Sequence, residues 1–503
     1  MDKLNSNEVV FATPITKTRV PVCDKSIVTE LSDDFTLPDY RAEIRRLLRI
    51  SATLPAPSAY TGGGNAEFSG DVVYKILYVG GDSKLHSADL VALYEVSAEL
   101  EGEEREGLAA TDEIEIESIV GRVSAPRKLS IRCRLRHRIT ARADRELNLP
   151  LDGEGIVKLH EVCPCAVSVS AEDDSHEIEE MIGGLIDPRI IFADATVLMS
   201  HASPRDGGIH CSGSVLLCVL SESEEGQLRK TDRKLPFEAV IPADVEGDGW
   251  ECRAYGCVPE LRTEMGANGL QCRMRLSLFA DAQKNLPVRI IGDIYSTEAA
   301  CEVETEELPV SEAKYCGIGN FTVSGTSEPS GLPENYRIVY ATATAEPEEL
   351  MVENEKYVLT GRCRFSAVMD GDEYSCREFE LPFRYEFGSS DSDEIGDYSV
   401  RMFCHSVRVR GEGKTLSADA ELSMAIRVQG KRNVRAVTSA ELGAPIGDGR
   451  PLYTVVYVPK GESLWSISKK YLVDPSSVAQ ANGLRCASPA ASDSLGGANF
   501  LII

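Results

Sequence analysis

An internal repeat with a period near 145 residues constrains this chain of 503 residues more than any other feature. A glycine next to strand-forming residues occurs three times, at Gly70, Gly213 and Gly361. An alternating apolar segment follows each glycine at a similar distance, beginning at Leu129, Leu270 and Leu416. Because two separate markers keep their register across three copies, we predict three copies of one structural unit.

Both markers are typical of β-strands. The segment from Leu129 to Leu135 alternates apolar and polar residues, which places one face of a strand inward. Turn pairs such as Asp370-Gly371 separate runs of strand-forming residues and favour hairpins. We therefore expect a mainly β chain of three sandwich-like units. We place them at residues 1–150, 151–299 and 300–440, with a linker at 441–450. One short helix is expected from Tyr40 to Leu48.

The last segment, 451–503, has a different pattern, which predicts a small α+β module in the order strand, helix, helix, strand. The first helix is capped by Glu462 or Ser463, and its apolar residues repeat at helical spacing. Asp474 caps the second helix, with Pro475 at its first position. Asn482-Gly483 ends that helix, and residues 500–503 form the closing strand.

Charge and composition exclude several classes of function. Lysine and arginine number 53 against 80 acidic residues, so the net charge is −27 and nucleic-acid binding is disfavoured. The N-terminus lacks the pattern of a secretory signal, and no apolar run is long enough for a transmembrane helix. We therefore expect a cytoplasmic protein. Its 15 cysteines are expected to be buried thiols, and Cys163 with Cys165 lacks the second pair that a zinc site needs.

No motif carries a recognisable chemistry. Gly411 to Thr415 is similar to a phosphate-binding loop, but Arg408 stands where the first glycine is required, so a hairpin turn is expected. The acidic segment 391–396 lacks two ligands of a calcium loop, and the acidic run 302–307 reads as a solvated surface. We expect no catalytic residue, no metal and no cofactor, and hence no enzyme.

The only basic ridge lies on one face of a predicted strand and consists of Arg132, Arg134, Arg136 and Arg138. Solvation or pairing with acidic groups of the same chain is the first interpretation, and a protein-docking surface is the second.

Residues Val456 to Tyr471, with Asn482-Gly483-Leu484 further on, resemble a LysM module. The resemblance implies a groove for N-acetylglucosamine polymers between two loops. The matching residues here are Gly461, Glu462, Ser463, Leu464, Asn482, Gly483 and Leu484. The stretch 495–499 departs from the usual Pro-Gly-Gln turn beside this groove, which lowers the expected affinity for glycan. Trp465 is expected to pack against the module rather than to contact a ligand.

The β-rich repeats resemble SPOCS domains, which occur in spore-coat assembly proteins of endospore-forming bacteria. Asp34 to Tyr40 is similar to that family's opening segment, and Asp293 to Ser296 to a stretch that recurs in it. SPOCS-like repeats followed by LysM resemble SipL-type coat morphogenetic proteins. The resemblance implies a scaffold in the mother-cell cytoplasm, at the forespore surface, whose LysM module docks to the spore-coat basement ATPase. The alternative is a peptidoglycan-binding protein.

Overall fold

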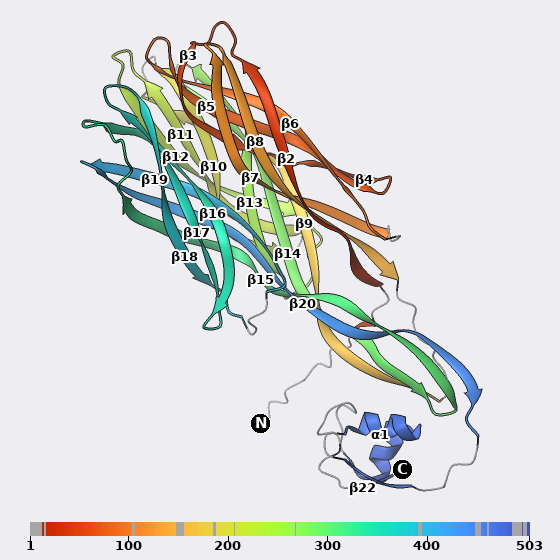
Figure 1. Ribbon diagram of the computed structural model, residues 1–503. Coiled ribbons are helices and arrows are strands. Elements are labelled where there is room, and N and C mark those ends of the chain that lie inside the picture. The colour runs from red at the N-terminus through yellow and green to blue at the C-terminus, as the bar shows by residue number, and fades with distance from the viewer. Residues whose placement is uncertain are drawn as a thin grey trace.

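Long antiparallel strands dominate the molecule, and a small helical module lies beside one end of them (Figure 1). The computed structural model describes residues 13–14, 17–102, 106–146, 155–184, 188–205, 207–266, 268–390, 395–447, 454–459, 462–484, 495 and 500–503. The predicted fold class, mainly β with a small α+β module, is confirmed.

Six long strands with one pairing pattern recur three times along the chain. The first strand pairs with the sixth, which also pairs with the fifth. The second pairs with the third, which also pairs with the fourth. Each repeat therefore forms two antiparallel three-stranded sheets, and their inner faces share one apolar core, as in a β-sandwich.

The strands of the first repeat are β2 (Lys17–Thr36), β3 (Ile44–Thr53), β5 (Asn65–Gly80), β6 (Leu85–Glu99), β7 (Glu106–Ala125) and β8 (Lys128–Glu146), with a short β4 (Ser58–Gly62) beside β5. Those of the second are β9 (Ile156–Ile182), β10 (Arg189–Arg205), β11 (Gly208–Glu222), β12 (Leu228–Pro242), β13 (Glu251–Gly266) and β14 (Gly269–Ser296). Those of the third are β15 (Ala299–Ser327), β16 (Arg337–Glu353), β17 (Lys356–Asp370), β18 (Ser375–Phe387), β19 (Asp397–Glu412) and β20 (Thr415–Pro445).

Two further groups of elements complete the chain. A short β1 (Thr13–Pro14) pairs in parallel with β14 and so joins a sheet of the second repeat. The C-terminal module consists of β21 (Val455–Tyr457), α1 (Leu464–Tyr471), α2 (Pro475–Ala481) and β22 (Phe500–Ile502). These four elements follow the predicted order of strand, helix, helix, strand.

The alternating segment that marks each copy lies in the sixth strand, at the centre of its sheet. Its inward residues are at most 5% exposed, which confirms the predicted alternation. They are Leu129, Ile131, Cys133 and Leu135 in β8, Leu270, Cys272, Met274 and Leu276 in β14, and Leu416, Ala418, Ala420 and Leu422 in β20.

The repeated glycine lies in the third strand, directly opposite an aromatic residue of the fourth. The pairs are Gly70 with Tyr94, Gly213 with Phe237 and Gly361 with Phe383. A Cβ atom on Gly361 would lie 2.3 Å from the Glu346 carbonyl oxygen and 2.6 Å from the Phe383 ring. The aromatic ring thus packs onto bare backbone, which explains why this position is glycine in every copy.

Gly361→Ala should therefore destabilise the third repeat by about 1–3 kcal/mol, because the added methyl group overpacks the strand junction. The midpoint of urea unfolding measures the loss. Gly447→Ala is the matched control, since nothing lies within 4 Å of a Cβ at that position. Equal midpoints for the two variants would contradict the packing argument.

The helix expected from Tyr40 to Leu48 is wrong. Residues from Ile44 onward form β3, which pairs with β5. Register shifts fall between Ile44 and Arg46 and between Leu47 and Arg49. Each shift adds a residue to one strand, so apolar residues of a strand recur at a spacing that imitates a helix.

The three repeats close into a ring around one shared apolar cluster. The fourth strand of each repeat contacts the second strand of the next: β6 contacts β10, β12 contacts β16 and β18 contacts β3. The cluster includes Leu77, Leu220 and Val368, which are spaced like the repeated glycines and so hold equivalent positions. The repeats are therefore arranged like three subunits of a trimer with approximate threefold symmetry.

A buried arginine joins the second repeat to the third. Arg253 of β13 donates through Nε to Asp281 Oδ2 over 2.7 Å and through Nη1 to the Ser399 carbonyl oxygen over 2.7 Å. Burial by itself raises the pKa of Asp281, but the opposing Arg253 and Arg427 charges hold that pKa below its usual value. The pair is therefore charged, and Asp281 holds the guanidinium of Arg253 where it reaches the third repeat.

Arg253→Ala should cost about 3–5 kcal/mol of stability, because it leaves the Asp281 carboxylate buried without its partner. Arg262→Ala, which removes an exposed arginine paired with Glu260, should cost about 1 kcal/mol or less. Urea unfolding of both variants checks the difference. A similar loss in the two would show that the junction does not depend on this pair.

The strands nearest the module extend beyond the sandwich cores. The first and last strands of the second and third repeats, β9, β14, β15 and β20, have 27 to 31 residues each and run on toward the module (Figure 1). β20 continues to Pro445, paired with β15, so the first half of the stretch 441–450 expected as a linker is strand. Paired strands of the second and third repeats therefore reach close to the module.

Candidate binding site

Hydrogen bonds at the helix ends set the local structure of the C-terminal module. Ser463 is the N-cap of α1: its Oγ accepts from the Ser466 backbone N–H over 3.1 Å, and Ser466 Oγ in turn accepts from the Ser463 N–H over 3.0 Å. Asp474 caps α2 by accepting from the Ser477 N–H over 2.8 Å, with Pro475 at the first position. The predicted caps are confirmed, with Ser463 rather than Glu462 as the first.

The two expected groove loops are held by the module's own fold. Leu464 is fully buried in the module core, and Leu484 packs against the same core. The Asn482 side-chain amide donates to the Val478 and Ile502 carbonyls, and its oxygen accepts from the Ile502 N–H over 2.8 Å. Asn482 therefore ties the end of α2 to β22.

Other groove residues are partly open to solvent. Glu462 and Ser463 are half-buried, and Glu462 accepts a hydrogen bond from Ser466 Oγ. Gly483 is exposed at φ +65°, a conformation that favours glycine. Gly461 lies outside the described residues. Ligand binding by these two loops stays a prediction.

The module is fastened to the second repeat through one face of α1. Trp465 donates from Nε1 to Asp293 Oδ2 over 2.9 Å, and Lys469 Nζ lies 2.6 Å from Asp293 Oδ1. The two side chains are four residues apart and so share a face of the helix. A register shift between Ile291 and Asp293 in β14 accompanies this contact, as expected where a bulge redirects a side chain.

Tyr295, two residues along β14, completes the contact. Its hydroxyl donates to the Val473 carbonyl oxygen over 2.6 Å, and its ring meets Trp465 edge to face at 5.1 Å. Burial raises the pKa of this hydroxyl, with Asp474 and Asp293 adding to the effect, so it remains a donor. We call Asp293 and Tyr295 with Trp465, Lys469 and Val473 the dock. Trp465 is buried, but against β14 rather than within the module as expected.

A cavity of about 360 Å³ adjoins the dock, between β14, β15, β20 and the last turn of α1. Asp293 and Lys469 both line it, together with Arg435. Its walls therefore carry two cations and one anion, and Cys301 is the one other potential metal ligand among the described lining residues, which is too few for a metal site.

A larger cleft of about 980 Å³ opens where the three repeats meet. Arg401 of the third repeat donates to the Ile114 carbonyl oxygen of the first over 3.1 Å and lies 5.9 Å from the Tyr255 ring of the second. Those three residues hold equivalent positions in their repeats. The cleft thus lies near the approximate threefold axis, with arginines, carboxylates and aromatic rings mixed on its walls.

A buried histidine behind the wall of this cleft, paired with the lining residue Asp112, was not anticipated from the sequence. His137 Nδ1 lies 2.7 Å from Asp112 Oδ2, and both side chains are inaccessible to solvent. A histidine with an aspartate forms two members of a hydrolytic triad. However, His137 Nε2 contacts no hydrogen-bond partner in the described part of the chain, so no nucleophile is held against it.

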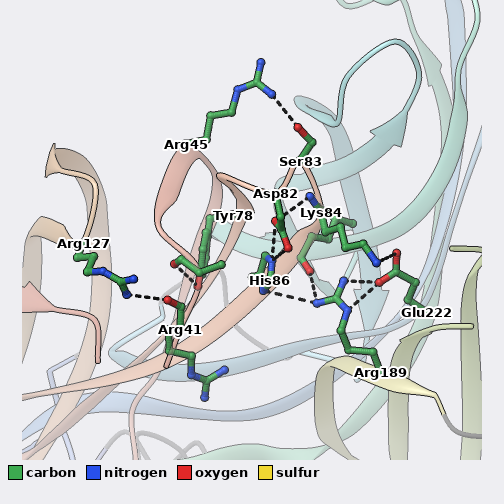
Figure 2. Close-up of polar contacts among 12 residues, drawn as sticks. Arg41, Arg45, Tyr78, Asp82, Ser83, Lys84, His86, Arg127, Arg189 and Glu222 are labelled. Carbon is green, nitrogen blue, oxygen red and sulfur yellow. Dashed lines mark hydrogen bonds and ion pairs between the residues drawn. The ribbon is translucent and has the colours of Figure 1, made fainter. Parts of the chain in front are cut away.

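Ion pairs between the first two repeats form a second polar cluster, shown in Figure 2. Arg189 Nε donates to Glu222 Oε2 over 2.7 Å, and Arg189 Nη1 donates to the Leu85 carbonyl oxygen of the first repeat over 2.9 Å. His86 lies 3.0 Å from Asp82 in the same cluster. Burial by itself raises the pKa of Asp82, but hydrogen bonds from the Lys84 N–H and His86 bring it below its usual value. The charges neutralise each other, so the cluster stabilises the junction between repeats.

The basic ridge on β8 is largely paired within the chain. Arg136 donates to Glu117 over 2.8 Å, Arg134 lies 3.6 Å from the same carboxylate, and Arg138 donates to Asp397 of the third repeat over 2.7 Å. The first interpretation of this ridge is therefore confirmed for three of its four arginines. Arg132 is exposed.

The remaining motifs take ordinary structural positions. The segment from Gly411 to Thr415 is the predicted hairpin turn between β19 and β20. Cys163 and Cys165 lie with their Sγ atoms 3.6 Å apart, and no group of three metal-ligating side chains occurs among the described residues. Residues 391–394 of the calcium-like loop lie outside the described part. Neither helix in that part is long and apolar enough to cross a membrane.

Comparison with known families decides the nature of the module whose caps, core and closing strand are given above. Residues 456–491 are a LysM domain. No curated protein and no solved structure matches the chain significantly. A LysM domain supports a role in binding peptidoglycan or another glycan, or in association with the cell envelope.

The dock yields a direct test. Asp293→Ala removes the acceptor of Trp465 and the partner of Lys469, so the LysM domain should leave β14 while the repeats stay folded. Small-angle X-ray scattering should show a larger maximum dimension, and acrylamide should quench the tryptophan fluorescence more strongly, because Trp465 becomes accessible while Trp250 is unchanged. Glu302→Ala, which alters an exposed carboxylate of β15, is the control. Unchanged scattering and quenching in Asp293→Ala would contradict the dock.

Proposed function

We propose that this chain is a non-enzymatic scaffold in assembly of the spore coat or envelope. In this proposal the LysM domain docks to a coat morphogenetic protein, the spore-coat basement ATPase, and the SPOCS-like repeats mediate further protein contacts. The chain would act in the mother-cell cytoplasm, at the forespore surface. The proposal assigns it no catalytic residue, cofactor or metal.

One observation carries the proposal: the LysM domain is fixed to the repeats by side-chain contacts and is not joined to them by a flexible linker alone. Three neighbouring contacts, from Asp293 and Tyr295 of β14 to α1 and Val473, hold it in one orientation. A rigidly presented domain loses less orientational freedom on binding a partner, which suits a scaffold that positions one protein relative to others. The repeats add a large surface, and buried contacts such as that from Arg253 of the second repeat to the Ser399 carbonyl oxygen of the third join its units.

Binding of N-acetylglucosamine polymers is the second candidate, because the LysM match itself favours it. The side chain of Asn482 in the expected groove already uses its donors and its acceptor within the module. That use of Asn482 favours the protein partner over the glycan, because less of the groove is free for hydrogen bonds to a sugar.

The two candidate functions predict different outcomes in a binding experiment. The scaffold proposal expects the full chain to bind the purified coat ATPase at micromolar concentration, with no competition from N-acetylglucosamine oligomers. Biolayer interferometry with and without the oligomers measures both. Saturable binding of the oligomers, with no binding of the ATPase, would reject the scaffold in favour of the glycan.

A further inference from the structure

The outer face of the LysM sheet is apolar, although one side of that sheet is already covered. The side chains on this face are Val455, Tyr457, Phe500 and Ile502, and they are 69%, 65%, 61% and 44% exposed. Val455 pairs with Ile502 and Tyr457 with Phe500, so the four lie together. The Tyr457 and Phe500 rings meet at 5.5 Å.

The inner face of the same sheet already provides the domain's core. Val456 and Leu501 are buried there against Leu464 and Ile467 of α1. An antiparallel sheet with one solvated face ordinarily alternates apolar and polar residues. β21 and β22 carry apolar residues on both faces, which is typical of a sheet that is covered on both sides.

The dock leaves this outer face free. Trp465 and Lys469 attach the domain by a flank of α1, on the helical side of the sheet. In Figure 1, β22 lies on the side of the domain turned away from the long strands. The chain therefore holds the domain by its helix and presents the apolar sheet face outward.

Area and charge indicate what covers the face. Four side chains at this exposure offer on the order of 400 Å², whereas a stable dimer buries about 800 Å² on each partner. Two copies of this chain would also each carry a net charge of −27 and repel one another. A second copy is therefore a poor occupant, and a different protein of opposite net charge fits better.

The charge of this chain also indicates the sign of the charge on that partner. Within 451–503 the charges nearly balance, with four basic residues and three acidic ones, so the acidity lies in the repeats. β15, which lines the cavity beside the dock, has exposed Glu302 and Glu304 on its other face. The net charge of the chain therefore attracts a partner of net positive charge, whereas the sheet face itself offers apolar contacts.

We propose that the outer face of β21 and β22 is the docking surface for a protein partner of net positive charge that carries an apolar patch. The proposal rests on the proposed function, in which the LysM domain binds a protein. It assigns recognition to the sheet face, away from the loops at Ser463 and Gly483.

Binding of the coat ATPase to full-length variants tests the surface. Tyr457→Thr combined with Phe500→Thr keeps strand-forming residues and should weaken binding about tenfold or more. Val455→Thr combined with Ile502→Thr is a second, independent pair and should weaken binding in the same direction. Higher salt should weaken binding of the unaltered chain, because salt screens the attraction between the acidic chain and a basic partner.

Leu93→Thr is the matched control, since Leu93 is an exposed apolar residue of β6 at 74% exposure and should leave binding unchanged. Circular dichroism melting checks that every variant folds. If the unaltered chain binds the ATPase and both double variants bind equally well, the surface is wrong and the scaffold stands. If the unaltered chain does not bind, both proposals fail. A dimer in mass photometry that both double variants abolish would replace the partner with a second copy.

Discussion

Pairing between the first and the last strand of each repeat is the interaction on which the rest of this molecule depends. β2 with β8, β9 with β14 and β15 with β20 form ladders of about 20 to 30 residues. Each ladder closes a sandwich, because it brings the beginning and the end of a repeat into one sheet. In the second and third repeats the same ladders continue beyond the core and form the platform on which the LysM domain is held.

The closed repeats then assemble as equivalent units. Their shared cluster places Leu77, Leu220 and Val368 together, and polar pairs at the junctions add specificity to apolar packing. Arg253 and Arg189 both reach across such junctions to backbone carbonyls. Many charges of this acidic chain thus serve contacts within it, and no group of three metal-ligating side chains occurs among the described residues.

Local patterns predicted those parts of the molecule that depend on local chemistry. The alternation in β8, the caps at Ser463 and Asp474 and the hairpin before Thr415 all follow from a few neighbouring residues. The expected helix at Tyr40 to Leu48 failed because two bulges in β3 broke the period of two, and only pairing with β5 reveals them. The domain boundaries and the groove residues stay predictions.

At the candidate site, prediction from sequence was limited by contacts between residues far apart in the chain. Trp465 was expected to pack against its own module, but it contacts Asp293, which lies 172 residues earlier, and no local pattern joins the two. Asp293 to Ser296 stood out only through resemblance to a recurring stretch in SPOCS domains. The apolar residues of β21 and β22 are visible in the sequence, yet alternation cannot show that both faces are apolar and only one is covered.

The closure of each repeat by its own last strand also bears on synthesis of the chain. While a ribosome is still making the second repeat, β9 lacks its pairing partner, because β14 begins more than 80 residues after β9 ends. Closure of the ring of three repeats comes later still, because β3 can contact β18 only when most of the polypeptide has emerged. Contacts so distant in sequence form slowly. The nascent chain therefore exposes unpaired strand edges for much of its synthesis, and a chaperone that shields them would raise the yield of native protein.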